Sequence, residues 1–389
     1  MMKKKKLLVT ASTFPRWEND TEPRFILDLS KAMTKYFDIT VLVPAAPNAK
    51  TEEVLEGVRV VRYHYFPVHK WETLCYPGAI VPRIKEKKTR ILLVPFLFIA
   101  LWWNVLKMIK NYDFVLAHWL IPQGIVQACF NKPYIVTGLG GDVGSLNNPI
   151  MKKLKLNTLN KAKHVVMVSG ELKRQLMSYY DGEDVSVISM GCDTTKFGQR
   201  NRVDNLFNQG EKKVVLFVGR LVEKKGAQYF IEAAKNIDAK FVIVGDGPLR
   251  ESLEKQAEPM KDKIVFLGAK TQEELVQIYA SADVLVAPSI TAKDGDKEGL
   301  PTAIIEAMAS GLPIIASDSG GIKEIVRNEE NGFLVEEKAV EQIEIAIKKI
   351  IGDELLHKYM QSEAIRTAKS YDYSFKAKKY VDLIEKALI

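Results

Sequence analysis

The sequence predicts an α/β protein built from two doubly wound domains, each a parallel sheet covered by helices on both faces. Its 389 residues, 47% of them hydrophobic, suit two cores better than one. Short runs of Val, Ile and Leu recur without polar alternation, which is typical of strands buried on both faces. Segments with helical periodicity separate these runs, as a parallel sheet requires.

The second half of the chain shows this alternation most regularly. We expect strands at 214–221, 240–245, 264–268, 283–288, 313–317 and 332–335. We expect helices between them at 228–236, 249–257, 273–281 and 302–310.

The first half repeats the scheme less regularly. Strands are expected at 7–11, 39–44, 58–62, 114–117, 134–137, 165–168 and 185–188. The polar stretch 201–210 lacks periodicity and is interpreted as the linker between domains 1–200 and 201–372. Residues 374–388 have helical spacing, so we expect 373–389 to pack back toward the first domain. Because such sheets bind ligands at the carboxyl ends of their strands, the working cleft is expected between the two domains.

Charge is divided unevenly along the chain. Residues 1–195 carry 27 Lys and Arg against 17 Asp and Glu, whereas residues 196–389 carry 29 against 31. A basic first half suits an anionic membrane surface or a phosphorylated partner. Nucleic acid is not expected as a partner, because no zinc knuckle, RNA-binding aromatic signature or helix-turn-helix pattern accompanies the charge.

The cysteines and the start of the chain favour a cytoplasmic protein. Cys75, Cys129 and Cys192 are odd in number, far apart and without metal-ligand spacing, so neither a disulfide framework nor a zinc site is indicated. The opening MMKKKKLLVTAS has too short an apolar run for a signal peptide and is interpreted as the beginning of the first strand.

The most informative segment is 288–326, which reads PSITAKDGDKEGLPTAIIEAMASGLPIIASDSGGIKEIV. Pro301 suits the first position of a helix, and Gly311 with Pro313 closes that helix. Glu298 then lies at the helix entrance and Glu306 about two turns further on. Free N–H groups from Gly299 to Thr302 are suited to a diphosphate, and the deeper carboxylate is suited to ribose hydroxyls.

A second informative segment is the strand-to-helix turn GRLVEKKG. It places Arg220 and Lys225 at the end of a buried strand, beside the entrance of the next helix. Two cations there are suited to holding a leaving diphosphate.

These segments, with VGDGPL between them, resemble glycosyltransferase family 4, a group of retaining enzymes with the GT-B fold. The resemblance covers essentially the whole chain and is strongest over 214–335. The pair Glu298 and Glu306 is similar to the paired glutamates of the family signature. The segments AHWLIPQG and DGDKEGLPTAIIEA resemble those of the family members that build colanic-acid-type, capsular and lipid-linked glycans.

The resemblance implies a role for each matched residue. Arg220 and Lys225 would grip the donor diphosphate, Glu306 the ribose, and Glu298 a hydroxyl of the transferred sugar. The catalytic group would also include His118, which lines the sugar site. The remaining implied donor contacts are the main chain near Phe266 and Leu267 at the base, Gly299, Leu300, Pro301 and Thr302 at the phosphates, and Gly245 and Gly247 in VGDGPL. On the acceptor or sugar side the implied residues are Arg24, Gly141 and Asp142.

Two segments depart from the family pattern. The first strand-to-helix loop reads STFPRWENDTEPRF where many members carry a Gly-Gly pair, which puts phosphate contact there in doubt. The turn TGLGGD carries Leu139 where relatives of this subset usually have His, which puts the acceptor side in doubt.

Structural interpretations compete with several of these assignments. Glu298 could cap its helix, Arg220 and Lys225 could be surface cations of a turn, and His118 could be a satisfied core histidine. Asp142 could cap a turn.

Asp294 and Asp296, in DGD, imitate a metal-binding Asp-x-Asp pair. A solvated acidic loop is preferred, because two cations already supply the electrostatic role of a metal.

The uncharged stretch 91–106, ILLVPFLFIALWWNVL, is short for a membrane span and contains Pro95. Interfacial insertion or burial in the core is expected instead of crossing, and the basic flanks with two tryptophans favour contact with a membrane.

The sequence as a whole predicts metal-independent sugar transfer with retention, from a UDP- or GDP-linked sugar to a glycan or lipid-linked acceptor. No cofactor is expected, since the nucleotide sugar is a substrate. The location expected is the cytoplasm, at the inner face of the cell membrane. The alternatives are a nucleotide-sugar-binding protein without turnover, or an epimerase or phosphorylase of the same fold.

Overall fold

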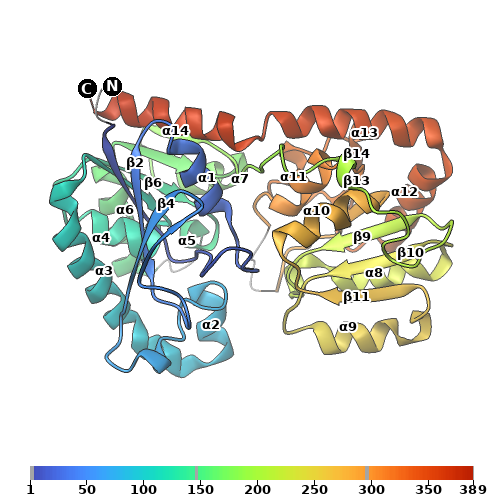
Figure 1. Cartoon of the computed structure of the whole chain (residues 1–389), viewed down its shortest axis with the longest axis horizontal. Helices are drawn as coiled ribbons and strands as arrows, with labels where there is room; N and C mark the ends of the chain where they lie inside the picture. The colour runs from blue at the N-terminus through green and yellow to red at the C-terminus, as the bar shows by residue number, and fades with distance from the viewer. Residues whose placement is uncertain (1–3, 145–147, 294–297, 389) are drawn as a thin grey trace. The chain divides into compact units, whose positions relative to one another are not determined.

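In a computed structural model of the chain, which describes residues 4–144, 148–293 and 298–388, the polypeptide divides into two compact units. The first unit comprises residues 1–189 together with 373–389, and the second comprises residues 190–372. Figure 1 shows a sheet flanked by helices in each. The α/β class expected from the uninterrupted apolar runs is therefore confirmed for both halves of the chain.

The first unit is built on an eight-stranded sheet with the order β3-β4-β2-β1-β5-β6-β7-β8. All neighbours pair in parallel except β3 and β4, which are antiparallel. The strands are β1 (Lys6–Thr10), β2 (Asp38–Pro44), β3 (Glu52–Leu55), β4 (Val58–Tyr63), β5 (Phe114–His118), β6 (Tyr134–Gly138), β7 (His164–Met167) and β8 (Val185–Val187). The seven strands predicted for this half are confirmed, and β3 was not predicted.

Helices cover this sheet, and the last one comes from the end of the chain. They are α1 (Phe25–Met33), α2 (Ile80–Glu86), α3 (Val94–Met108), α4 (Ile125–Gln127), α5 (Gly141–Gly144), α6 (Pro149–Lys161), α7 (Gly170–Met177) and α14 (Tyr373–Ala387). Helix α14 packs against α1 (Figure 1) because Ala377, Tyr380, Val381 and Ile384 form one apolar face. The Tyr380 hydroxyl also lies 3.3 Å from the Thr137 hydroxyl of β6.

The second unit has six parallel strands in the order β11-β10-β9-β12-β13-β14. They are β9 (Val214–Val218), β10 (Lys240–Val244), β11 (Ile264–Gly268), β12 (Val284–Ala287), β13 (Ile314–Ser317) and β14 (Gly332–Val335), as predicted to within a few residues. Its helices are α8 (Ala227–Ala233), α9 (Arg250–Ala257), α10 (Gln272–Ser281), α11 (Thr302–Ala309), α12 (Val340–Gly352) and α13 (Glu354–Lys369).

Two apolar clusters form the core of the second unit, one on each face of its sheet. Residues of α10, α11 and α13 contribute to one cluster, and residues of α8, α9 and α12 to the other. Both faces are therefore covered, which explains why the strands are continuously apolar.

The division between the units falls after Ser189, whereas the sequence interpretation placed it after residue 200. Cys192 forms a β-bridge with Asp372, and Phe197 and Phe207 are buried in the core of the second unit. The stretch 201–210, which its polar composition predicted to be a linker, thus contributes the core side chain of Phe207 to the second unit.

Candidate functional site

The segments that follow neighbouring strands of the second unit meet closely at the carboxyl edge of its sheet. Gly245, after β10, has φ +133°, and a Cβ atom there would lie 1.9 Å from the Gly219 carbonyl oxygen after β9. Gly226 has φ +67°, and its Cβ would lie 1.8 Å from the Pro288 carbonyl oxygen after β12. Only glycine, which has no Cβ atom, fits this close to another backbone. At these two glycines the loops that follow β9, β10 and β12 therefore meet.

Within this edge, Lys225 and Glu298 form an ion pair. The distance between Lys225 Nζ and Glu298 Oε2 is 2.9 Å, and both side chains are largely withdrawn from solvent. A backbone hydrogen bond from the Ile290 N–H to the Lys224 carbonyl, at 2.8 Å, ties the same two loops together. Two residues that the sequence separates widely are thus held in one place by the adjacency of β9 and β12.

The charge state of Glu298 is set by two opposing effects. Burial disfavours its ionised form, but the ammonium groups of Lys225 and Lys224 outweigh burial, and the pKa of Glu298 lies below its ordinary value. Glu298 is therefore a carboxylate at neutral pH. Lys224 was missed by the sequence interpretation, although it stands next to Lys225 in GRLVEKKG.

Glu306 lies in the second turn of α11 and is half-buried. It accepts a hydrogen bond of 3.0 Å from the hydroxyl of Tyr279, a fully buried residue of α10. Burial and the adjacent carboxylate raise the pKa of Tyr279 well above its usual range, so the tyrosine remains a donor. Tyr279 orients Glu306, and nothing in the sequence indicated this contact.

The residues predicted to contact phosphate precede and begin α11. Pro301 occupies the N-cap position, and within the described part of the chain no side chain caps this helix. The Gly299 carbonyl accepts a 3.0 Å hydrogen bond from the Gly321 N–H after β13, while Leu300 is buried in the core. Thr302 is the first helical residue, so the amides of the first turn start at this edge.

The remaining predicted donor residues lie along the same edge. Arg220 follows β9 and is half-buried. Gly247 packs against the Leu221 backbone, where a Cβ atom would lie 2.5 Å from the Leu221 carbonyl oxygen. Phe266 and Leu267 alternate along β11, so they pack toward opposite faces of the sheet.

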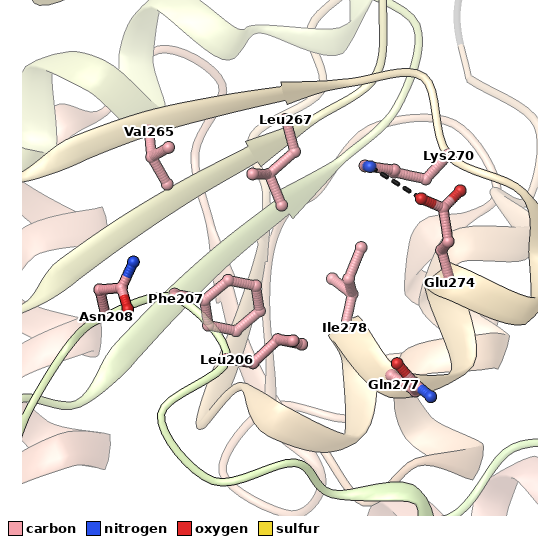
Figure 2. A pocket seen from close by; sticks show the side chains of 9 residues that line it. All are labelled: Leu206, Phe207, Asn208, Val265, Leu267, Lys270, Glu274, Gln277 and Ile278. Carbon is pink, nitrogen blue, oxygen red and sulfur yellow. Dashed lines mark hydrogen bonds and ion pairs between the residues drawn. The ribbon is translucent and has the colours of Figure 1, made fainter.

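A pocket of about 300 Å³ adjoins the face of β11 that carries Leu267. Figure 2 shows its apolar side chains, contributed by β11, α10 and the segment 206–208, with Lys270 and Glu274 at its border. Lys270 Nζ lies 2.8 Å from Glu274 Oε1, and Glu274 also forms a capping box with Thr271. Leu267 belongs both to this pocket and to the predicted donor residues.

In the first unit, His118 ends β5 and is 2% exposed. Within the described part of the chain, neither of its ring nitrogens has a hydrogen-bond partner. Burial lowers the pKa of His118 to about 3, so the ring is neutral at physiological pH. A buried, neutral imidazole with both nitrogens unsatisfied is not the satisfied core histidine of the structural alternative.

Asp142 connects the loop after β5 with the loop after β6. One carboxylate oxygen accepts a 2.8 Å hydrogen bond from the Leu120 N–H, and the other accepts from the N–H groups of Leu139 and Gly140 at 3.1 and 2.9 Å. Burial raises the pKa of Asp142, and these donors oppose the rise. The described contacts give Asp142 the turn-organising geometry of the structural alternative, and Leu139 and Gly141 both precede it in this turn.

Arg24 is held by carboxylates of its own unit. Its guanidinium donates to Asp28 at 3.0 Å, one turn along α1, and to Glu56 in the β3–β4 turn. These contacts pair the Arg24 guanidinium within its own unit, while its buried Nε has no hydrogen-bond partner among the described residues.

Within the described ranges 4–144, 148–293 and 298–388, no cluster of three His, Cys, Asp or Glu side chains is arranged to hold a metal ion. Asp294 and Asp296 lie outside the residues that the structure describes.

The chain belongs to the glycosyltransferases of family 4. Residues 23–196 match the family model described as Glycosyltransferase Family 4, and residues 199–367 match the one described as Glycosyl transferases group 1. The two matches together span almost the whole of 23–367, and the resemblance stated from the motifs is thereby confirmed.

Relatives agree with this membership. An uncharacterized glycosyltransferase of Methanocaldococcus jannaschii is 28% identical over 83% of this chain and 89% of its own length. The amylovoran biosynthesis glycosyltransferase AmsK of Erwinia amylovora is 35% identical over 40% of this chain and 39% of its own. A UDP-Gal:alpha-D-GlcNAc-diphosphoundecaprenol alpha-1,3-galactosyltransferase of Escherichia coli is 34% identical over 46% and 48%.

Solved structures agree with the fold. The sucrose-phosphate synthase of Thermosynechococcus elongatus superimposes with a TM-score of 0.80 over 98% of this chain and 99% of its own, at 19% identity. The GT-B fold expected from the motifs is confirmed.

Proposed function

We propose that this glycosyltransferase moves a sugar from a nucleoside diphosphate sugar, UDP- or GDP-linked, with retention of the anomeric configuration and without a metal ion. The observation that carries the proposal is the Lys225–Glu298 ion pair at the carboxyl edge of the second sheet, next to the beginning of α11. A cation and the amides of a first helical turn are together suited to a diphosphate.

Each candidate residue has a role that its surroundings support. Arg220 and Lys225 stabilise the negative charge that develops as the bond between sugar and diphosphate loosens. Removing one such donor typically costs about 3 kcal/mol, or roughly a hundredfold in rate. Glu306, oriented by Tyr279 at 3.0 Å, accepts hydrogen bonds from the ribose. Glu298 accepts a hydrogen bond from a hydroxyl group of the transferred sugar. A phosphate oxygen of the donor takes the proton that the attacking hydroxyl of the acceptor loses.

For His118, in the first unit, we propose a hydrogen-bonding contact with a sugar. Its two unsatisfied ring nitrogens can donate one hydrogen bond and accept another, which suits the hydroxyl groups of a sugar. Because burial keeps the ring neutral, His118 acts here as a hydrogen-bonding partner and not as a cation.

For the acceptor we propose a glycan or lipid-linked saccharide at the cytoplasmic face of a membrane. The galactosyltransferase relative is named for a diphosphoundecaprenol-linked sugar, and AmsK is named for amylovoran biosynthesis. Both relatives match less than half of this chain, so they support the class of acceptor and not its identity.

The direct test is thermal stabilisation by a panel of nucleotide sugars, followed by transfer assays with the stabilising compound. A ligand at a hundred times its dissociation constant adds about 2.7 kcal/mol to stability. Proton NMR of the product then reports the anomeric configuration. Inversion would overturn the proposed mechanism, and the absence of stabilisation by any nucleotide sugar would overturn the donor class.

A nucleotide-sugar-binding protein without turnover is the second candidate. It is favoured by Leu139, which replaces a histidine expected on the acceptor side. Stabilisation by a nucleotide sugar without either transfer or donor hydrolysis would identify this alternative.

A further inference from the structure

Helix α3 presents an apolar surface that the first unit does not cover. The segment Lys88–Asn111, which includes α3, contains an 18-residue window with a mean hydropathy of 1.9, yet only 22% of that window is buried. By length and composition this segment could cross a membrane. A core helix of a parallel α/β unit would be mostly buried, so core packing does not explain its composition.

The two faces of α3 differ in what they contact. Leu97, Leu101 and Val105 recur every four residues and are buried, so they attach the helix to its unit. Phe96, Ile99 and Trp103 follow the i, i+3, i+7 spacing of the opposite face and are exposed, Ile99 to 65% and Trp103 to 51%. Helix α3 is therefore apolar on two faces, of which only one packs against the rest of the first unit.

The exposed face continues into neighbouring segments. Leu92, in the turn before α3, is 70% exposed. Phe66 packs edge-on against Phe96 with ring centroids 4.9 Å apart, and Trp71 lies 5.8 Å from Phe66. We call this set, Phe66, Trp71, Leu92, Phe96, Ile99 and Trp103, the α3 surface. Because it joins segments distant in sequence, it is a surface of the folded unit and not of one helix.

Cations flank the α3 surface. Between residues 80 and 112 the sequence holds seven Lys and Arg and a single acidic residue, Glu86. Glu86 pairs with Arg83 and Arg90, while Lys87, Lys88, Lys107 and Lys110 are exposed. An apolar ridge with two tryptophans and a cationic border matches the interface of an anionic bilayer, where aromatic rings insert and cations meet lipid headgroups.

We infer that the α3 surface docks the first unit on an anionic membrane, with α3 lying in the interface and not crossing it. Crossing would require Leu97, Leu101 and Val105 to leave the core of the unit. A second copy of the chain fits the surface less well, because two such surfaces would bring their cationic borders together. This inference rests on the proposed function in one respect, since docking would bring the enzyme to a lipid-linked acceptor. Docking itself requires neither the donor nor the acceptor.

The test is co-sedimentation of the full chain with phosphatidylglycerol-containing and pure phosphatidylcholine vesicles at low and high salt. We expect binding to the anionic vesicles at low salt, weak binding to the neutral ones, and release by salt. Failure to bind anionic vesicles at low salt, equal binding to both lipids, or retention at high salt and alkaline pH as an integral protein would each overturn the inference.

Two variants separate the apolar and the charged contributions. Leu92→Gln with Ile99→Gln keeps the net charge, and we expect the partition coefficient to fall at least tenfold. Lys87→Gln with Lys88→Gln keeps the apolar ridge, and we expect a fall of about thirtyfold at low salt. All these side chains are exposed, so folding is expected to be retained and can be checked by circular dichroism.

Matched controls come from elsewhere in the chain. Leu355→Gln with Ile150→Gln replaces two apolar side chains of comparable exposure, and Lys152→Gln with Lys153→Gln removes the same charge from the same unit. Both controls should bind vesicles as the parent does. Equal losses in controls and test variants, or a dimer in lipid-free buffer that Ile99→Gln dissociates, would overturn the assignment. Thermal stabilisation by a nucleotide sugar should be unchanged in every variant, so loss of docking and failure of the proposed function remain distinguishable.

Discussion

Lys225 and Glu298 lie 2.9 Å apart although one follows β9 and the other follows β12, and the pair joins the two loops at the carboxyl edge of the sheet. The cation keeps the carboxylate ionised against the effect of burial. Because a bound diphosphate would also be attracted to Lys225, the same ammonium connects the sugar end of the proposed site with its phosphate end.

This arrangement predicts that replacing Glu306 and replacing Glu298 affect different steps, namely nucleotide binding and turnover. We expect Glu306→Ala to weaken binding of the nucleotide, because ribose is held equally in the ground and transition states. We expect Glu298→Ala mainly to lower kcat, because the sugar it contacts moves during transfer. Calorimetry of nucleotide binding and steady-state kinetics measure the two effects, and equal losses of both parameters in both variants would contradict the assignment.

A sharper control for Glu306 uses the nucleotide itself. The parent should bind the nucleoside diphosphate more tightly than its 2′,3′-dideoxy analogue, whereas Glu306→Ala should bind the two alike. Tyr279→Phe should weaken this discrimination by a smaller factor, since it removes one 3.0 Å hydrogen bond that orients the carboxylate. Unchanged discrimination in Glu306→Ala would place the ribose elsewhere.

The pH dependence of kcat/KM is expected to change when Lys225 is replaced, because Lys225 lowers the pKa of Glu298. The pKa of Glu298 is depressed, so the carboxylate is ionised throughout the range above its ordinary pKa of about 4.3. In Lys225→Met the cation is gone while burial remains, so the pKa of Glu298 rises and the acidic limb of kcat/KM moves to higher pH. Lys224→Met should move it less, because Lys224 is the weaker of the two coulombic effects. Superimposable acidic limbs in all three proteins would refute this coupling.

Two glycines are expected to be indispensable for the shape of the same edge. Gly226→Ala and Gly245→Ala would place a Cβ atom within 2 Å of a backbone oxygen, at positive φ. We expect each to lower the unfolding free energy of the second unit by about 3 kcal/mol or more. Gly352→Ala is the control, because a Cβ there meets no atom within 4 Å. Thermal unfolding measures the difference, and near-parental stability of both test variants would contradict the close approach.

Much of the second unit could be predicted from sequence, because its strands are buried on both faces and read as uninterrupted apolar runs. The predicted strands 264–268 and 332–335 coincide with β11 and β14. By contrast, β3 was not predicted, since its four residues, EEVL, lie at the edge of the sheet and are mostly exposed. No helix was assigned to 340–369, although α12 and α13 lie there.

The residues of the candidate site could be named from motifs, but their partners could not. Lys225 meets Glu298 because β12 lies beside β9, an order that skips β10 and β11 and that no local pattern encodes. Tyr279 meets Glu306 because α10 and α11 pack on the same face. Arg24, in turn, looked available in the sequence and is paired within its own unit with Asp28 and Glu56.

Metal independence is a prediction that chelation tests directly. We expect transfer to persist in EDTA, because Arg220 and Lys225 supply the positive charge that a divalent ion would otherwise provide. Loss of activity in EDTA with rescue by manganese would contradict the prediction. In that case Asp294→Asn and Asp296→Asn become the variants of choice, because DGD is the acidic pair that the sequence offers.

The burial of His118 predicts how the stability of the first unit depends on pH. The pKa of His118 is about 3 in the folded chain and about 6.5 when unfolded, so the unfolded state binds the extra proton between these values. Stability should therefore fall as the pH drops below about 6.5, by up to about 1.4 kcal/mol per pH unit for this one group. Above that pH the group has no effect.

The five tryptophans, Trp17, Trp71, Trp102, Trp103 and Trp119, all lie in the first unit, so their fluorescence reports its unfolding selectively. Urea unfolding followed by this signal at pH 7, 6 and 5 should give a shallower pH slope in His118→Asn than in the parent, whatever the stability of the variant at pH 7. His164, whose pKa is also lowered by burial but which is less buried, provides the comparison, and His164→Gln should flatten the slope less. Parallel slopes in His118→Asn and the parent would mean that the His118 ring can take up a proton in the folded unit. That outcome would also remove the basis for its proposed role as a neutral partner of the sugar.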